Sequence, residues 1–153
     1  MDLISTDVTK LLDKMSTDDT LVLEDKEIEH HFPINNDEEL NSFELFLSED
    51  KNHNKFIQYV SRLGGSTLPE AVRRAMERVI SDDLIQNYSW LGQKGKQNFG
   101  VLIMAQGMKD GIKRNKILQK SVTEASIECC MRNWMRHAKD RINKRSKKAA
   151  VIR

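Results

Sequence analysis

The stretch Tyr88-Ser89-Trp90-Leu91-Gly92-Gln93-Lys94-Gly95-Lys96 combines an aromatic pair, two glycines and two lysines. It lies between two segments with helical periodicity, so we expect a structured loop. The glycines permit positive φ angles and the close approach of a phosphate or another backbone, while Trp90 is large enough to anchor the loop in a core. Lys94 and Lys96 would then face outward. The alternative is a plain connector whose tryptophan only packs.

Helical patterns precede this loop. Asn36 is a candidate N-cap with Glu39 three residues later, and Thr67 opens a second capping box ahead of a helix expected to run to about Asn87. Between them, apolar residues from Phe56 to Leu63 share one helical face, which ends at a pair of glycines, and a turn is expected around residues 50–54.

Two more helices are predicted after the loop. The first runs from about Phe99 to Ile112 and contains Gly107 and Gly111, which would allow a close helix contact. The last helix is expected to open at a capping box that begins with Ser121. Its apolar face continues to about residue 142, and its opposite side is basic.

These patterns predict an all-α fold, a compact bundle of about five helices preceded by an acidic, partly flexible N-terminal arm. The arm covers residues 1–31 and includes a short amphipathic helix over 2–15. The helical domain covers residues 32–143, and a basic tail covers 144–153.

The net charge of +2 hides a division between the two ends of the chain. Residues 1–50 contain 15 acidic and 3 basic residues, and the remaining residues contain 8 acidic and 22 basic ones, so the two parts carry about −12 and +14. A basic domain implies a polyanionic partner such as nucleic acid. The acidic arm implies either shielding of that surface or a separate protein contact.

The basic side of the last helix and the tail carry most of the candidate nucleic-acid contacts. Lysine and arginine suit phosphates, and arginine and asparagine can also read base edges. A solvated charged face is the alternative interpretation. Residues 143–148 also resemble a basic nuclear import signal, so we expect a nuclear protein.

Enzymatic and metal-binding functions are not predicted. Gln97 stands where a Walker A loop needs serine or threonine, and His30 and His31 lack ligands at metal spacing and are expected to face solvent. Cys129 and Cys130 are adjacent on a helix, which makes them poor disulfide partners. We therefore expect reduced thiols, no cofactor, no metal, no small-molecule substrate and no catalytic residue.

No stretch resembles a membrane span, and the first residues lack the basic and apolar parts of a signal peptide. The spacing of Gly92 and Gly95 matches the GxxG loop of RNA-binding KH domains, but strands typical of that fold are not predicted around it. We therefore expect no membrane partner and do not expect RNA binding through a loop of the KH type.

Several short motifs, taken in order, resemble an uncharacterised family, domain of unknown function 4806 (DUF4806). They are Phe32-Pro33-Ile34, Asp37-Glu38-Glu39-Leu40, Phe43-Glu44, Leu63-Gly64-Gly65, Ala71-Val72-Arg73-Arg74, the stretch from Tyr88 to Lys96, and Trp134-Met135-Arg136-His137-Ala138-Lys139-Asp140-Arg141. The resemblance covers about residues 32–143. This family occurs in animal proteins, several of which are transposon-related and carry zinc-coordinating DNA-binding modules. The resemblance therefore implies a protein of that kind.

The family is also distantly similar to the BEN domain, an all-helical module that binds DNA and often self-associates. That similarity implies DNA contacts from the last helix and neighbouring loops. Carried onto this chain, it gives the candidates Lys94, Lys96, Arg132, Asn133, Arg136, Lys139, Arg141, Lys144 and Arg145.

Two classes of function are therefore predicted. The first is a DNA-binding domain associated with chromatin, transcription or transposons, whose partner is duplex DNA, with backbone amides near Ser121 as additional phosphate anchors. The second is a protein-interaction or homodimerisation module with an apolar contact surface that contains Met or Trp side chains. If the candidate lysines and arginines gather on one face, the first class is favoured.

Overall fold

The computed structural model describes the chain over residues 25–152, and side chains up to residue 149. The helix predicted over residues 2–15 lies outside these residues. The chain divides into two compact units, Met1–His30 and His31–Arg153. In the first unit, residues 25–29 are helical.

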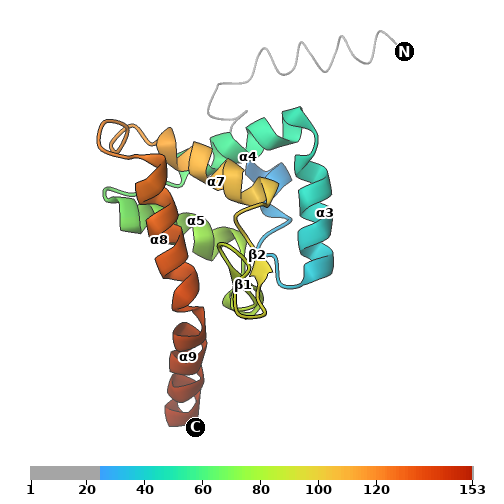
Figure 1. The fold of residues 1–153 in the computed structure, drawn as a ribbon, viewed down its shortest axis with the longest axis vertical. Coiled ribbons are helices and arrows are strands. Elements are labelled where there is room, and N and C mark those ends of the chain that lie inside the picture. The colour runs from blue at the N-terminus through green and yellow to red at the C-terminus, as the bar shows by residue number, and fades with distance from the viewer. Residues whose placement is uncertain (1–24, 153) are drawn as a thin grey trace. The chain divides into compact units, whose positions relative to one another are not determined.

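The second unit is mostly helical, with two short strands among its described residues, which confirms the all-α prediction (Figure 1). Its elements in chain order are α3 (Asp37–Leu47), α4 (Asp50–Arg62), α5 (Leu68–Val79), α6 (Asp82–Ile85), β1 (Tyr88–Ser89), β2 (Gln97–Asn98), α7 (Ile103–Lys113), α8 (Glu124–Arg136) and α9 (Ala138–Ile152).

Two predicted helix starts are confirmed. The Asn36 side chain accepts a hydrogen bond from the Glu39 amide at 2.8 Å, and Thr67 accepts one from the Glu70 amide at 3.3 Å. Each side chain thereby satisfies an amide that has no partner inside its helix. The predicted turn over residues 50–54 is wrong, because these residues already form the first part of α4.

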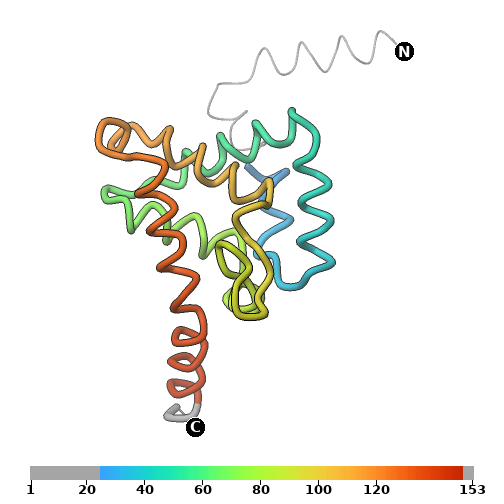
Figure 2. Tube along the Cα trace, viewed as in Figure 1, coloured from blue at the N-terminus to red at the C-terminus, as the bar shows by residue number. Residues whose placement is uncertain are grey.

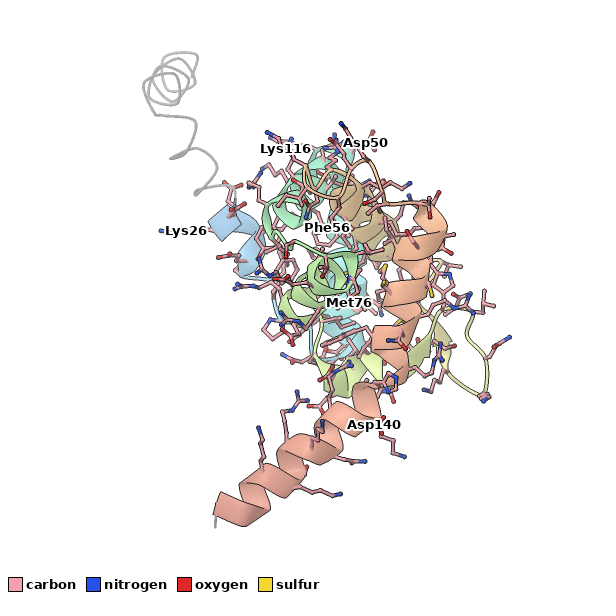
Figure 3. The ribbon with its side chains drawn as sticks, turned by 90° about the vertical axis from the view of Figure 1, so that its left-hand side faces the viewer. Lys26, Asp50, Phe56, Met76, Lys116 and Asp140 are labelled. Atoms are coloured by element: carbon pink, nitrogen blue, oxygen red, sulfur yellow. The ribbon has the colours of Figure 1, made fainter. Side chains whose placement is uncertain are left out.

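The core centres on α4 and α7, which pack closely because of two glycines. A Cβ atom added to Gly111 would lie 2.5 Å from the Val60 Cβ, and one on Gly107 would lie 2.6 Å from the Phe56 Cδ2. Both distances are far below a van der Waals contact, so the predicted close helix contact is confirmed. Phe56 lies fully buried on α4, as does Met76 on α5 (Figure 3).

The helix predicted from Thr67 to about Asn87 is interrupted. Ile80 adopts extended φ and ψ angles of −134° and 135°. The reason is a parallel bridge to Ile34, whose amide donates to the Val79 carbonyl at 2.8 Å and whose carbonyl accepts from the Ser81 amide at 3.0 Å. Ser81 then caps the short helix α6.

The helix predicted from Phe99 begins later, at Ile103, and its cap comes from another helix. The Glu44 carboxylate of α3 accepts hydrogen bonds from the Ile103 and Met104 amides at 2.8 and 2.9 Å. A negative charge at this position also complements the helix dipole.

The predicted last helix is in fact two helices. Its N-cap is Thr123 rather than Ser121, since Thr123 and Ser126 form the reciprocal capping box. The amides near Ser121 therefore lie outside the first turn of α8. His137 forms the C-cap of α8, and α9 (Ala138–Ile152) follows it (Figure 2).

Two smaller observations complete the fold. None of the helices in the described part of the chain is long and apolar enough to cross a membrane. His31 does not face solvent as predicted: it is half-buried, with its ring centroid 4.6 Å from that of Phe46 and 5.1 Å from that of Phe43.

Candidate nucleic-acid interface

The loop from Tyr88 to Lys96 is anchored at its aromatic end. Strand β1 pairs in parallel with β2, so that Tyr88 lies opposite Gln97 and Ser89 opposite Asn98. The Trp90 side chain is buried against Gly100, where an added Cβ would lie 3.0 Å from the indole Cε2. Glycine at position 100 therefore gives Trp90 its space, and the predicted anchoring of the loop is confirmed.

Tyr88 fixes the start of the loop to α3. Its hydroxyl donates a hydrogen bond to the Asp37 carboxylate at 2.8 Å. Burial, followed by this hydrogen bond and the negative charge of Asp37, raises the pKa of Tyr88 well above its ordinary value. Tyr88 therefore stays a neutral donor at any physiological pH.

The lysine end of the loop turns through three positive φ angles, 71° at Gly92, 58° at Lys94 and 76° at Gly95. Two hydrogen bonds hold this turn: the Gln93 amide donates to the Ser89 hydroxyl at 2.9 Å, and the Lys96 amide donates to the Gln93 carbonyl at 3.1 Å. The Lys94 and Lys96 side chains are exposed, as the sequence predicted.

Helix α8 is set beside the loop by a buried lysine of α7. The Lys109 ammonium lies 2.9 Å from the Glu128 carboxylate, 3.1 Å from that of Glu124 and 5.5 Å from the centre of the Trp90 ring. Burial alone would lower the pKa of Lys109, but the hydrogen bonds and charges of Glu128 and Glu124 outweigh it and raise the pKa. Lys109 thus joins α7, α8 and the loop as a permanently charged group.

The register of α8 decides which of its side chains reach the loop. Ile127, Met131 and Met135 are buried, whereas Arg132 and Arg136 are exposed. Arginines four residues apart lie on the same face of a helix. The second half of α8 therefore presents two guanidinium groups.

These two arginines and the two loop lysines line one cavity of about 240 Å³. Its lining residues are Tyr88, Ser89, Trp90, Leu91, Gln93, Lys94, Lys96, Arg132, Met135 and Arg136, so it carries four formal positive charges and no carboxylate. Residues more than thirty positions apart in the chain thus converge, and four of the nine candidate residues share one cavity.

None of these four cationic side chains forms an ion pair or hydrogen bond with another side chain in the described part of the protein. Like charges repel, and each ammonium or guanidinium keeps its donors available for an incoming anion. The arrangement can therefore bind phosphate groups, which accept from lysine and arginine.

Three other candidates lie apart from the cavity. Asn133 lines a separate groove of about 780 Å³ between α5 and α8, together with Trp134 and Arg136, so Arg136 borders both hollows. Lys139 and Lys144 are exposed on α9 and are not among the cavity residues.

Arg141 and Arg145 have an intramolecular partner that the sequence did not reveal. Both guanidinium groups pair with the Asp82 carboxylate of α6, at 2.7 and 2.9 Å. Arg141 also donates to the Trp134 carbonyl at 2.7 Å and stacks on the Trp134 ring, 3.5 Å from its centre. The geometry gives Arg141 a structural role at the joint between α8 and α9, although the sequence suggested a DNA contact.

Within the described residues, no group of three histidine, cysteine, aspartate or glutamate side chains could hold a metal ion. Both cysteines are free, with Cys129 exposed and Cys130 half-buried. Burial and the neighbouring Cys129 raise the pKa of the Cys130 thiol, which disfavours the reactive thiolate.

The fold and cavity define a helical domain with a cluster of four cations that are unpaired within the described residues. The sequence model of the family described as Domain of unknown function (DUF4806) matches residues 26–125. This match spans well over half of the chain, so the protein belongs to the DUF4806 family. The match includes the loop but ends at the start of α8, whereas the sequence resemblance extended to about residue 143. No curated protein and no solved structure matches the chain.

Proposed function

We propose that this domain binds nucleic acid, with duplex DNA as its partner, through Lys94 and Lys96 of the loop and Arg132 and Arg136 of α8. One observation carries the proposal: four cations line a single cavity, and none of them has an acidic partner among residues 25–149. In a folded domain such a cluster costs free energy through repulsion, and a polyanion relieves it by neutralising the charges.

The distant similarity to the BEN domain supports the same proposal, since in that module the last helix and adjacent loops contact DNA. The exposed lysines Lys139 and Lys144 of α9 would add phosphate contacts beyond the cavity. A nuclear protein associated with transcription, chromatin or transposons would fit this activity. The proposed DNA binding requires no cofactor, metal or catalytic group.

The proposal is tested by fluorescence anisotropy with a labelled DNA duplex at about 50 mM salt. We expect Lys94→Ala/Lys96→Ala and Arg132→Ala/Arg136→Ala each to weaken binding by at least about tenfold, because each removes two phosphate donors. The matched control is Lys116→Ala/Lys120→Ala, which removes the same charge from exposed positions between α7 and α8. In Figure 3, Lys116 lies far from Asp140. Asp140 is near the start of α9, which follows closely after Arg136 at the end of α8.

Equal weakening by all three double variants would show only a general dependence on net charge and would contradict a defined binding face. Absence of binding by the intact protein would reject the proposal outright.

The alternative is a protein-interaction or homodimerisation module, and the groove between α5 and α8 favours it. Its walls include the apolar or weakly polar side chains of Pro69, Val72, Cys130 and Trp134. A concentration-dependent dimer in light scattering that Pro69→Asp, at an exposed position of the groove wall, abolishes would support this function, and a monomer at all concentrations would exclude the homodimer.

A further inference from the structure

The cavity beside the loop is not built as a phosphate site alone. Its cations stand on exposed side chains, but Tyr88, Trp90 and Met135 contribute largely buried, mainly apolar surface to its wall. A phosphate pressed against apolar surface would lose hydration without compensation. The wall therefore suits an uncharged, flat group that is attached to an anion.

The volume supports the same ligand. The space of about 240 Å³ is several times the roughly 30 Å³ that one water molecule occupies, so a group of several heavy atoms fits beside the cations.

The cavity also has the side chains that a base requires. Leu91 is an apolar residue in the wall of the cavity, and 56% of its surface is exposed to solvent. The Gln93 carboxamide, which bonds to no other side chain in the described residues, offers both donors and an acceptor to a base edge.

From these observations we propose that the cavity receives one unpaired nucleotide of a DNA strand. Its base would enter between Leu91, Gln93 and Met135. The phosphates on either side would lie against Lys94, Lys96, Arg132 and Arg136. This inference rests on the proposed nucleic-acid binding and specifies its substrate: DNA that contains a nucleotide already outside the stack, since extruding a paired one costs a few kcal/mol.

The test compares three labelled duplexes of equal sequence: a perfect duplex, the same duplex with one bulged nucleotide, and a duplex whose bulge is abasic. The abasic bulge retains the flexibility and the phosphates but lacks the base. We expect the base-bearing bulge to bind about tenfold more tightly than the perfect duplex, and the abasic bulge to lose this advantage.

Two exposed substitutions assign the effect to the cavity. Leu91→Ser should abolish the preference for the base-bearing bulge, measured as the ratio of its affinity to that of the abasic bulge, and Gln93→Ala should reduce this ratio. Val101→Ser is the matched control, because Val101 is also an exposed apolar residue but does not line the cavity.

Equal affinity for the perfect and bulged duplexes, or for the two kinds of bulge, would overturn the inference while leaving the proposed function intact. Failure to bind any of the three would overturn both. Binding of a phosphopeptide by the intact protein, when none of the three duplexes binds, would assign the cationic cavity to protein recognition instead.

Discussion

Two groups of arginine and lysine side chains in this domain behave in opposite ways. Around Asp82, Arg141 and Arg145 are paired with a carboxylate that is only 9% exposed, and Lys109 is paired twice near Trp90. Around the cavity, four cations have no such partner within the part of the chain that the structure describes. Residue type alone therefore does not separate charges that stabilise the fold from charges left available to a ligand, whereas their pairing in the folded state does.

The largest expected effect concerns the paired group. Asp82→Ala leaves the partly buried Arg141 without its carboxylate, and we expect the free energy of unfolding to fall by about 2 kcal/mol. Urea unfolding followed by tryptophan fluorescence measures this. Asp83→Ala, an exposed neighbour, is the control and should change stability by less than about 0.5 kcal/mol. Similar losses in both variants would mean that the arginine pairing contributes nothing specific.

The stabilisation from Asp82 should depend on pH. Burial alone would raise the pKa of Asp82, but hydrogen bonds and the charges of Arg141 and Arg145 hold it below its ordinary value of 3.8. A carboxyl with a lowered pKa stabilises the fold above its unfolded pKa and loses this effect as the pH falls through the folded value. The stability difference between wild type and Asp82→Ala should therefore be constant above about pH 5 and shrink near pH 3. A difference that persists at low pH would contradict the assignment.

A smaller effect is expected at Lys109. Lys109→Met keeps the buried stem but removes the charge that faces Glu124, Glu128 and the Trp90 ring, so stability should fall by about 1 kcal/mol. Lys113→Met is the matched control, since Lys113 pairs with Glu124 at 3.5 Å and is 38% exposed. If Lys113→Met lowers the free energy of unfolding as much as Lys109→Met does, the burial of Lys109 does not increase the contribution of its ion pairs.

The smallest effect should appear in the unpaired group. Lys94→Ala/Lys96→Ala removes no ion pair within the described residues, so its free energy of unfolding should stay within about 0.5 kcal/mol of that of wild type or rise slightly as repulsion is relieved. Chemical denaturation at low salt measures the change. A loss of more than about 1 kcal/mol would show that these lysines support the fold.

Much of the fold could be predicted because its signals are local. The caps at Asn36 and Thr67 depend on residues three positions away, and Gly107 and Gly111 mark a helix face with small side chains. The large side chain of Trp90 predicted that the loop is anchored in the core. Each of these features is readable from a short window of sequence.

The errors arose where a distant residue decides the structure. The break at Ile80 is fixed by Ile34, and the start of α7 is fixed by Glu44, which lies 59 residues earlier than Ile103. The shift from Ser121 to Thr123 has a different cause: serine at position 126 replaces the acidic partner that the predicted capping box used.

The candidate site shows the same limit. Lys94, Lys96, Arg132 and Arg136 were named from the sequence, and the structure gathers them at one cavity. The partner of Arg141 was missed because Asp82 lies 59 residues away. The places of Leu91 and Gln93 in the cavity wall could not be predicted either, since nothing in their sequence context distinguishes them from other loop residues.

The most direct test of unpaired cations as the binding surface is the salt dependence of DNA affinity. We would compare wild type, the quadruple variant Lys94→Ala/Lys96→Ala/Arg132→Ala/Arg136→Ala, and the control Lys116→Ala/Lys120→Ala. Each phosphate contact contributes about 0.9 to the slope of log affinity against log salt, so the quadruple variant should be shallower by about 3 to 4 and the control unchanged. Equal slopes for wild type and the quadruple variant would contradict the account.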